Sequence, residues 1–544
     1  MSAPVLWLAV ALSGVVTGLA AAPRDVPALA YVGFAGLTFF FARGMESARA
    51  HGAWRRGLGL GFVYGLAINA LVLRFSVALL IDFGHMPSPV AVLVSLALWS
   101  TQALVHAVMG GIVGALSEAV DRERRALFAC AILPPALVVA EHVVPMLFPW
   151  RLAAGLASWV PMMQAAELGG EPLLTLQVSV TACAFVALGE LAPSGLPGSR
   201  ARLGVLCAAA LLVPFAYGSW RVAAVESARS RATRLRVGLV QPNVGIGDKG
   251  RDELAFDHFD RLAAMTRTLQ ERGAEVVVWP ETAAPFSMRR TMRREPEGPW
   301  SLLDRGIGVP VLMGVVTWHS VVRKHNSAIV LRPDGTYSEP ADKLELIPFG
   351  EFTPGWGMLR TVVRTVWPDA PFRPYVERLR GFTPGDAPVL LEVDAPGRRR
   401  SARPTRLGVM ICYEDILPAI GRRVFHAAGG PPDVLVNMTN DAWFGDGDEP
   451  HLHLALSRFR AIETRRDLVR AVNTGVSAAI TATGEVTKRT ATFVPAAVIA
   501  EVRLLSGTTP YMVLGDWVVS VAFALIASLA AGRATATVAP GRVA

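Results

Sequence analysis

Three side chains of this sequence could together carry out nucleophilic chemistry on a carbonyl group: a thiol, a carboxylate and an ammonium. Cys412 follows the apolar run Gly-Val-Met-Ile at 408–411 and is the only one of the four cysteines outside the most apolar segments. Glu281 ends the run Val-Val-Val-Trp-Pro-Glu, and Lys343 precedes Leu-Glu-Leu-Ile-Pro-Phe-Gly-Glu351. A thiol with a pKa of about 8.5 is mostly protonated at neutral pH, so it needs a base or a cation beside it. The sequence therefore suggests a Glu-Lys-Cys catalytic set.

Each of the three positions suits its chemistry, and each also has an ordinary alternative. Pro280 would fix the chain direction after a strand and place Glu281 at its end as a general base, where an exposed loop carboxylate is the alternative. Only four of the 53 basic residues are lysines, so Lys343 could mark a need for a compact ammonium against an oxyanion, although a surface lysine is possible. Cys412 stands where a strand runs into a helix, and the N–H of Tyr413 could donate to the oxyanion; an inert buried thiol is the alternative. The three motifs together favour the catalytic interpretation.

The composition indicates that these residues belong to a protein that lies partly in lipid. The chain has 544 residues, of which 52% are hydrophobic and only 18% are charged, and this is too apolar for an average soluble protein. Several segments are almost free of charge and come close to the ~20 residues that a spanning helix needs. They are 4–22, 26–42, 57–73, 89–118, 126–147, 172–191, 203–220 and 512–531. We therefore expect a polytopic α-helical membrane bundle of about eight spans.

The loops between these segments carry arginine mainly on one side of the expected bundle. That side holds Arg43, Arg49, Arg55, Arg56, Arg122, Arg124, Arg125, Arg200, Arg202, Arg533 and Arg542. The opposite short loops hold little beyond Arg24 and Arg151, so the positive-inside rule places both termini in the cytoplasm. We expect an N-terminal bundle of about seven helices at 1–220, an extracytoplasmic domain at 221–511, and a last helix with a short tail at 512–544. The first apolar segment is interpreted as a retained span; a cleaved signal peptide would leave an odd number of spans.

From Arg234 onward the pattern changes to short β-rich runs separated by helical stretches. Strands are predicted at Leu235–Val240, Glu275–Trp279, Val309–Val316, Ser327–Leu331, Leu407–Ile411, Val434–Met438, Leu468–Val472 and Val476–Ala482. Helices are predicted near Asp252–Arg272, Asp415–Ala427 and Leu452–Arg465. This alternation favours a layered α/β fold with strands buried on both faces. Residues 286–306 and 351–385, rich in Pro, Gly, Arg and Trp, are interpreted as insertions at strand ends, where loops often shape a site.

The other notable residues point to less specific roles. The net charge of +9 comes almost entirely from arginine, and the expected topology favours an anionic membrane surface over nucleic acid as its partner. The basic run that contains Arg289, Arg290, Arg293 and Arg294 is interpreted as a solvated face, with membrane contact as the alternative. Cys130, Cys183 and Cys207 are expected to be small buried thiols. His451 and His453 stand two residues apart at a helix start and face different ways, so no metal is expected.

The chemical motifs resemble the nitrilase, or carbon–nitrogen hydrolase, superfamily. Trp-Pro-Glu281, Lys343 followed by Pro-Phe-Gly-Glu351, and Cys412-Tyr413-Glu414 carry this resemblance. Further matching blocks, in the same order as in that family, are Val-Gln241-Pro-Asn243, Asn326-Ser327-Ala, Thr-Asn440-Asp441-Ala-Trp443-Phe444-Gly, Arg458-Phe-Arg-Ala-Ile-Glu463 and Arg470-Ala-Val-Asn473-Thr-Gly475-Val. Thr509-Pro-Tyr511 before the last span and Phe148-Pro149-Trp150 in an outer loop also fit. The membrane context is similar to the apolipoprotein N-acyltransferase family, strongly over 234–511 and mostly in hydropathy over 1–220.

The resemblance implies a nitrilase-like four-layer α-β-β-α sandwich on a membrane bundle. It also implies a ping-pong N-acyltransferase on the periplasmic side of the bacterial inner membrane. Glu281 would take the proton of Cys412, whose thiolate would accept an acyl chain from a phospholipid, typically phosphatidylethanolamine. The amine of a diacylglyceryl-cysteine at the N-terminus of an apolipoprotein would then attack the thioester. No metal or other cofactor is implied, and a monomer is expected.

The same resemblance assigns supporting roles. Lys343 and the amide of Tyr413 would hold the oxyanion in both half-reactions. Glu351 would position Lys343 or assist proton transfer, while Tyr413 and Glu414 would shape the acyl pocket.

One departure from the family pattern concerns substrate gating. Some members carry a Trp shortly after the Gln-x-Asn block, where this chain has Asp-Lys249-Gly250. A mobile aromatic lid is then absent or comes from elsewhere, with Trp356 and Trp443 as candidates. Two other functions remain open: a membrane-tethered amidase that uses the same triad on a small amide, and a transporter or scaffold with an outer binding domain. The few ionisable residues within the spans disfavour the transporter.

Overall fold

The computed structural model describes residues 2–47, 52–190, 199–320, 323–366, 381–394 and 403–538. These residues form two compact units. The helical unit consists of residues 1–227, 447–463 and 508–544, and the α/β unit consists of residues 228–446 and 464–507. Arg49 and Arg542, which the sequence assigns to the cytoplasmic loops, and residues 367–380 of the second predicted insertion lie outside the described residues.

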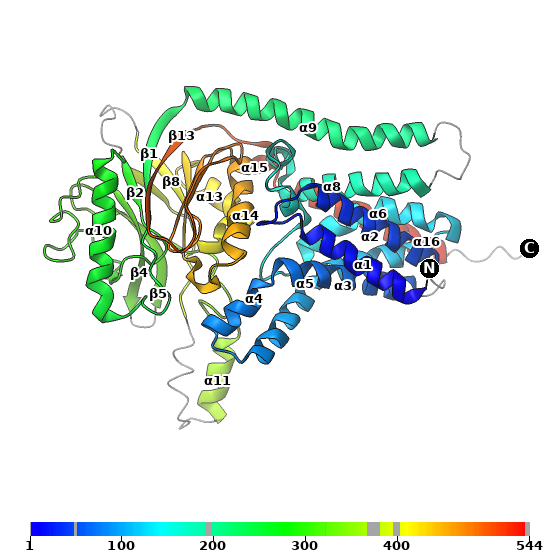
Figure 1. Cartoon of the computed structure of the whole chain (residues 1–544), viewed down its shortest axis with the longest axis horizontal. Helices are drawn as coiled ribbons and strands as arrows, with labels where there is room; N and C mark the ends of the chain where they lie inside the picture. Colours follow the sequence, from blue (N-terminus) through cyan, green and yellow to red (C-terminus); the bar gives the residue numbers. More distant parts are fainter. Residues whose placement is uncertain are drawn as a thin grey trace, which may run out of the picture. The chain divides into compact units, whose positions relative to one another are not determined.

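The helical unit contains one helix for each of the predicted apolar segments. These helices are α1 (Ala3–Gly18), α2 (Ala28–Glu46), α3 (Ala53–Val72), α5 (Ser88–Ser117), α6 (Arg125–Val143), α8 (Ala166–Glu190), α9 (Ser199–Arg231) and α16 (Trp517–Val538) (Figure 1). Shorter helices are α4 (Phe75–Ala78), α7 (Val160–Met163), α14 (Glu449–Thr464) and α15 (Pro510–Leu514). Among the described residues, five helices are long and apolar enough to cross a membrane, and a bent pair that begins with α3 makes up to six. Since α1 and the apolar part of α16 are shorter, the number of eight spans stays a prediction.

Small residues allow two helices of this unit to pack closely. Gly57, Gly61 and Gly65 repeat every fourth residue along one face of α3. A Cβ at Gly61 would lie 1.9 Å from the backbone oxygen of His106, and one at Gly57 would lie 2.1 Å from that of Gly110, both on α5. Such stripes of small residues let backbones approach where lipid provides no hydrophobic drive for helix association. The glycine spacing in α3 therefore fixes its contact with α5.

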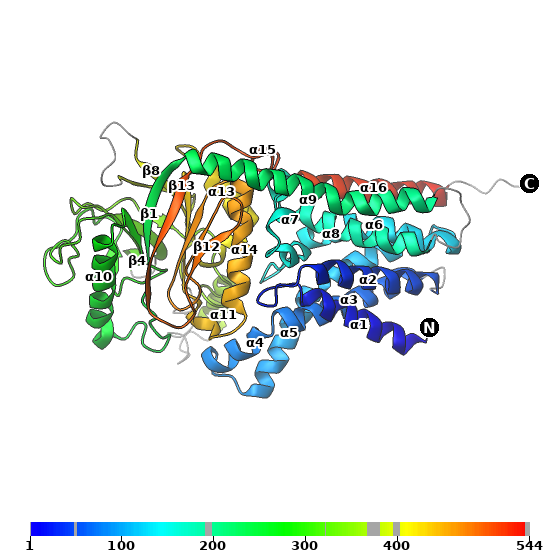
Figure 2. The ribbon, with the colours of Figure 1, turned by 45° about the horizontal axis from the view of Figure 1, so that its top comes forward.

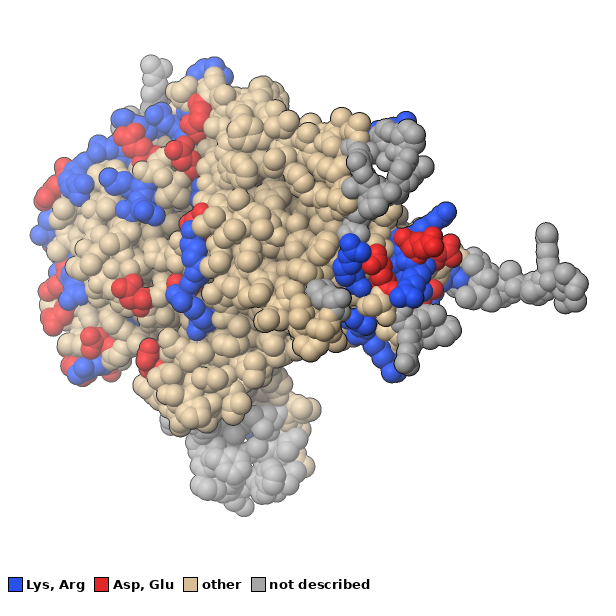
Figure 3. All heavy atoms as spheres, turned by 45° about the vertical axis from the view of Figure 1, so that its right-hand side comes forward, with Lys and Arg blue, Asp and Glu red and all other residues tan. Residues whose placement is uncertain are grey.

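Basic residues that the sequence assigns to one side of the bundle do lie together in the helical unit. Arg43 pairs with Glu46 at 3.2 Å, and Arg122 Nε donates to the backbone oxygen of Glu46 at 2.7 Å. Arg533 Nη2 lies 2.8 Å from a carboxylate oxygen of Glu118. Figure 3 shows a broad surface without charged side chains that ends at a cluster of blue and red side chains. A belt of this kind is what a bilayer requires of a spanning protein.

The α/β unit contains two sheets, and all of its predicted strands have a counterpart. The first sheet has the strand order β13-β1-β2-β4-β5-β6, with β3 paired to β4, and the second has the order β12-β11-β10-β9-β8-β7. The bounds in the first sheet are β1 (Thr233–Gln241), β2 (Val276–Val278), β3 (Ser287–Arg289), β4 (Val311–Ser320), β5 (Arg323–Leu331), β6 (Ala341–Asp342) and β13 (Ala496–Leu504). Those in the second are β7 (Leu390–Val393), β8 (Thr405–Ile411), β9 (Val434–Thr439), β10 (Leu468–Val472), β11 (Ala478–Ile480) and β12 (Val486–Arg489). The sequence did not predict β3, β6, β7, β12 or β13.

The two sheets pack face to face, with a helix on each outer face. In β1, the side chains of Leu235, Val237 and Leu239 belong to a core cluster that also includes residues of the second sheet. Val240 points the other way, into a cluster with Phe259 of α10 (Ala255–Glu271), because successive strand residues face opposite sides. Figure 2 shows α10 on the outer face of the first sheet and α13 (Pro418–Phe425) on the side of the second. The predicted four-layer α-β-β-α sandwich is confirmed.

The parallel strands at the centre of each sheet bring the candidate residues to strand ends. Strand β2 is parallel to both β1 and β4, and β8 is parallel to β9, which is parallel to β10. Glu281 follows β2, and Cys412 follows β8. Residues after the carboxyl ends of parallel strands commonly line sites in α/β folds.

Candidate active site

Glu281 stands in a tight turn after β2. The N–H of Trp279 donates to the backbone oxygen of Leu312 in β4 at 2.8 Å, which ties the end of β2 to its neighbour. Thr282, the next residue after Glu281, has a φ of 44°, a left-handed conformation that is strained for a β-branched residue. The turn runs directly over Gly314 of β4, where a Cβ would lie 2.2 Å from the backbone oxygen of Pro280. The turn directs the Glu281 side chain into the buried interior, where Glu281 is 6% exposed.

Lys343 directly follows the short strand β6 and is almost completely buried, with 1% exposure. Its backbone N–H donates to the oxygen of Asn326 in β5 at 2.8 Å. Its Nζ lies 3.2 Å from Glu281 Oε1 and 2.8 Å from Glu351 Oε2. A buried ammonium is stable only when it is paired in this way. The sequence alone allowed a surface lysine at this position, and its burial excludes that alternative.

Cys412 directly follows β8 and begins a short 3₁₀-helix, Cys412–Ile416. Its φ is 57°, so the chain reverses direction sharply at the thiol. Asn437 Nδ2 in β9 donates to the backbone oxygen of Cys412 at 2.8 Å and helps to fix this turn. The N–H of Tyr413 lies in the first turn of the helix, where N–H groups have no intrahelical acceptor. This position suits a donor to an oxyanion on a carbonyl attacked by Cys412.

Electrostatic effects link the thiol to the other two residues. Burial raises the pKa of the Cys412 thiol well above its ordinary value, the negative charge of Glu281 raises it further, and the Lys343 ammonium opposes both. Burial alone would lower the pKa of Lys343, but Cys412 in its thiolate form and the negative charges of Glu281 and Glu351 outweigh this effect and hold that pKa well above its usual range. The resting site therefore holds a neutral thiol beside a permanent ammonium. Such a thiol needs a base at the moment of attack.

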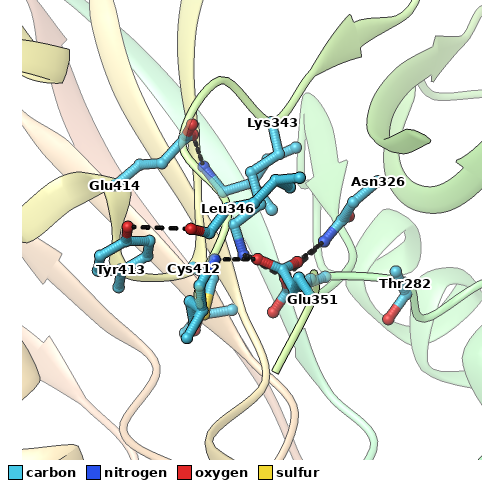
Figure 4. A network of polar contacts seen from close by, with 12 residues as sticks. Thr282, Asn326, Lys343, Leu346, Glu351, Cys412, Tyr413 and Glu414 are labelled. Atoms are coloured by element: carbon cyan, nitrogen blue, oxygen red, sulfur yellow. Dashed lines mark hydrogen bonds and ion pairs between the residues drawn. The ribbon is translucent and has the colours of Figure 1, made fainter. Parts of the chain in front are cut away.

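Glu351 and Asn326 make further polar contacts that link Glu281 to Lys343. Asn326 Nδ2 donates to Glu281 Oε1 at 2.7 Å and to Glu351 Oε1 at 3.0 Å. Glu351 Oε2 also accepts from the N–H of Ile347 at 2.9 Å. Figure 4 shows Lys343, Glu351 and Asn326 pointing toward one another beside Cys412. One amide and one ammonium thus hold both carboxylates.

Glu414 joins the loop of the nucleophile to the loop of the lysine. Its Oε2 accepts from the N–H of Ile411 at 2.7 Å, and its Oε1 accepts from the N–H groups of Leu344 and Glu345 at 2.6 and 3.0 Å. Burial raises the pKa of Glu414 to about 7, although these backbone N–H groups oppose the rise. The buried carboxyl group therefore joins the residues next to Cys412 to those next to Lys343 through hydrogen bonds.

Tyr413 contacts the same loop from the other side of the nucleophile. Its ring lies with its centroid 5.9 Å from Lys343 Nζ. Its hydroxyl donates to the backbone oxygen of Leu346 at 3.4 Å. The structure therefore places all six of the predicted site residues in one connected cluster: Glu281, Lys343, Glu351, Cys412, Tyr413 and Glu414.

Two residues of this cluster had no assigned role in the sequence analysis. Asn326 appeared there only inside a family block, although an asparagine in an apolar strand is a signal for a satisfied buried amide. Lys249 appeared only beside the missing lid tryptophan. Its Nζ donates to Thr282 Oγ1 at 2.7 Å and to the backbone oxygen of Glu281 at 3.1 Å. Of the two candidates for an aromatic lid, Trp356 begins α11 (Trp356–Val366), and Trp443 lies in the 3₁₀-helix Asp441–Phe444.

Comparison with known proteins finds matches for both units of the chain. The family model for carbon–nitrogen hydrolase matches residues 236–508, and that for the apolipoprotein N-acyltransferase N-terminal domain matches residues 13–184. An apolipoprotein N-acyltransferase from Geobacter metallireducens is 28% identical, over 97% of this chain and 95% of the relative. One from Azotobacter vinelandii is 30% identical, over 93% of this chain and 90% of the relative.

The solved structures include an amidase from Nesterenkonia sp. that is 16% identical, with a TM-score of 0.34, over 50% of this chain and 92% of the amidase. The two matched family domains follow one another in the order that the sequence analysis expected, apolar helices first and the α/β unit second. The chain belongs to the apolipoprotein N-acyltransferase family, within the carbon–nitrogen hydrolase superfamily.

Proposed function

We propose that this chain transfers a fatty acyl chain from a membrane phospholipid, through a thioester on Cys412, to the N-terminal amine of diacylglyceryl-cysteine in a lipoprotein. The observation that carries the proposal is the buried cluster of Glu281, Lys343 and Cys412 in a chain that also has a unit of membrane-length apolar helices. An enzyme that acts on a small soluble amide has no need of several such helices. An enzyme whose acyl donor resides in the bilayer does need them.

In the first half-reaction, Glu281 takes the proton from the Cys412 thiol as Sγ attacks the ester carbonyl carbon of the phospholipid. This transfer neutralises Glu281, which removes the negative charge that raises the pKa of the thiol. Lys343 and the N–H of Tyr413 hold the oxyanion of the tetrahedral intermediate. The ester C–O bond then breaks, Glu281 returns the proton to the leaving oxygen, and a lysophospholipid departs. Cys412 is left as a thioester.

In the second half-reaction, the α-amine of the diacylglyceryl-cysteine attacks the thioester carbon. Glu281 now accepts a proton from this amine, and the same donors hold the second oxyanion. The C–S bond breaks, the new amide departs, and the thiolate of Cys412 regains its proton from Glu281. Both halves therefore use one base and one oxyanion site, and the thioester links them in a ping-pong reaction.

The side chains of Glu351, Tyr413 and Glu414 support this chemistry indirectly. Glu351, which pairs with Lys343 at 2.8 Å, fixes the direction of the ammonium. Tyr413 and Glu414 shape the acyl site by holding the loop that follows Lys343. We assign the catalytic domain to 221–511, between a bundle at 1–220 and a last helix with its tail at 512–544.

The proposal also includes the location of the enzyme. The arginine-rich end of the helical unit, with Arg43, Arg122 and Arg533, supports cytoplasmic termini and a periplasmic catalytic domain in a bacterial inner membrane. The acyl donor is phosphatidylethanolamine, the acceptor is a diacylglyceryl apolipoprotein, and the enzyme acts as a monomer without a metal or other cofactor.

Intact-protein mass spectrometry tests the proposal. The purified chain is incubated with phosphatidylethanolamine, beside Cys412→Ala and Glu281→Gln variants. The expected result is a mass gain of one fatty acyl group in the unmodified chain. Cys412→Ala should show no gain, and Glu281→Gln should acquire it about 10²–10⁴-fold more slowly, the range for the loss of a general base.

The second half-reaction separates this activity from hydrolysis. A diacylglyceryl-cysteine peptide should discharge the acyl group and gain its mass, while water alone should discharge it slowly. Absence of an acyl adduct, under conditions where a control acyltransferase is acylated, would overturn the proposal. If a small amide is then supplied in place of the phospholipid, its turnover would identify a membrane-tethered amidase.

A further inference from the structure

Lys249 holds the turn that carries Glu281. It lies in a short loop after β1, where its own N–H donates to the backbone oxygen of Gly245 at 3.0 Å. Its side chain crosses to the next strand end, where Nζ donates to the oxygen of Glu281 at 3.1 Å and to Thr282 Oγ1 at 2.7 Å. Neither contact involves a group that reacts. The ammonium therefore acts on the backbone and side chain that flank the base.

The conformation of this turn needs such support. Thr282 has its left-handed φ of 44°, a strained conformation that persists only when its surroundings enforce it. On one side, β4 supports the turn, because the N–H of Ala284 donates to the oxygen of Gly314 at 3.0 Å. Lys249 provides two hydrogen bonds from the other side. Without them, the peptide between Glu281 and Thr282 would be held from one side only.

Lys249 also balances charge. The cluster contains the carboxylates of Glu281 and Glu351 but a single bridging ammonium, Lys343. Burying an uncompensated charge is strongly unfavourable. A second ammonium at Lys249 makes the four groups neutral overall while Cys412 carries its proton. Burial lowers the pKa of Lys249 to about 8, and the negative charge of Glu281 opposes this effect.

We propose that Lys249 is a positioning cation of this active site, which fixes the Glu281–Thr282 turn and supplies the positive charge that keeps Glu281 ionised as the base for Cys412. This role rests on the proposed acyl transfer and concerns its first half-reaction. It requires the protonated form of Lys249. The segment around Gly250, which lacks the lid tryptophan of some relatives, thus contributes a different element of the site.

The test measures the rate of acyl-enzyme formation in a single turnover, by intact mass, so that the acceptor amine takes no part. Lys249→Met should slow acylation about 30-fold or more, while Lys249→Arg, which keeps the charge, should recover at least a third of the wild-type rate. Lys488→Met is the matched control, since Lys488 is an exposed residue of β12. It should leave the rate unchanged.

A pH profile of the same half-reaction adds a readout that a purely structural role would not move. The titratable groups that act on Lys249 are Glu281 and Cys412, and the pKa values of Cys412 and Lys343 lie well above their ordinary values. Acylation by the wild type should therefore decline as the pH rises through about 8, the pKa of Lys249. In Lys249→Arg this decline should move upward by at least one pH unit, because a guanidinium stays protonated at these pH values.

The outcomes separate this role from the proposed function. A wild-type rate in Lys249→Met would overturn the role of Lys249, and so would a Lys249→Arg profile that declines at the same pH as the wild type. If Lys249→Met fails to fold, the pH profile of Lys249→Arg decides the question alone. Absence of any acyl-enzyme in the unmodified chain would overturn the proposed function, and with it this role.

Discussion

Arg290 Nη1 lies 2.6 Å from Asp342 Oδ1, and this ion pair stands directly before Lys343 in the chain. The same carboxylate oxygen accepts from Ser327 Oγ at 2.6 Å, beside Asn326. The pair therefore fixes residues that are next to Lys343 and Asn326 of the candidate active-site cluster. The basic run that contains Arg290 predicts a solvated face, but the Arg290 side chain is only 18% exposed. Arg293, in the same run, is half-exposed and pairs with Glu339 at the surface.

Replacing Arg290 should impair catalysis without touching the substrate. Arg290→Met leaves Asp342 in a mostly buried place without its cation, so the loop that carries Lys343 should lose its fixed position. We expect acylation to slow about tenfold, which corresponds to about 1.4 kcal/mol in activation free energy. Arg234→Met is the control, since its ion pair with Glu501 is half-exposed and exposed ion pairs contribute little. Equal rates in the two variants would show that the Arg290–Asp342 pair has no part in positioning Lys343.

Adding a methyl group at Gly314 should displace the base. A Cβ there would lie 2.2 Å from the oxygen of Pro280 and 2.5 Å from the N of Thr282. Gly314→Ala should therefore lower the free energy of unfolding by about 1–3 kcal/mol, as overpacking does, and reduce acylation strongly. In Gly308→Ala the nearest atom would be 3.9 Å away, so stability and rate should stay near wild type. Thermal unfolding in detergent and single-turnover acylation measure the two effects; normal values for Gly314→Ala would contradict the geometry of the turn.

Charge and shape at Asn326 can be separated by two substitutions. Asn326→Ala removes the amide that joins Glu281 and Glu351, and should slow acylation about tenfold, an effect of the size expected for a buried hydrogen-bond bridge. Asn326→Asp keeps the size but sets a third carboxylate against the other two, so it should slow acylation by about a further tenfold, since like charges at this distance repel strongly. The comparison uses rates of acyl-enzyme formation at one pH. A faster Asp variant than Ala variant would contradict the bridging role.

Glu414 should give the fold a specific pH dependence. Burial raises the pKa of its carboxyl from 4.5 to about 7 in the folded chain. Between these values the folded state binds a proton that the unfolded state has released, so stability falls as the pH rises from 4.5 through about 7. We expect the unfolding temperature of the wild type to decline across this window more steeply than that of Glu414→Gln, which cannot titrate.

The Glu414→Gln variant should also be less stable overall. A glutamine offers one oxygen where the carboxylate accepts from the N–H groups of Ile411, Leu344 and Glu345. Leaving buried donors without an acceptor destabilises by about 1–3 kcal/mol. Parallel pH profiles for both proteins would show that Glu414 keeps one protonation state throughout the window.

Strands with continuous apolar sequence could be predicted because burial on both faces leaves a local signal. Runs such as Val276–Val278 and Val434–Thr439 are apolar enough to be recognised without their neighbours. Strand β13 was missed, because its half-buried sequence Ala-Ala-Val-Ile-Ala-Glu-Val-Arg-Leu is weakly patterned and its conformation depends on antiparallel pairing with β1. Helix α9 continues to Arg231 beyond the apolar window that ended at 220, since polar helix formers extend a helix without any hydropathy signal.

The sequence by itself determined the kinds of groups available: one thiol in the α/β unit, a rare lysine, and a carboxylate after an apolar strand. It also determined the apolar helices, because lipid requires long uncharged segments. Only the tertiary structure decided which polar groups share a buried space. Hydrogen bonds made by Asn326, Glu414 and Lys249 join residues that are 45, 70 and 33 positions apart. Such contacts follow from strand order and from the need to pair every buried charge, and neither is written in the local sequence.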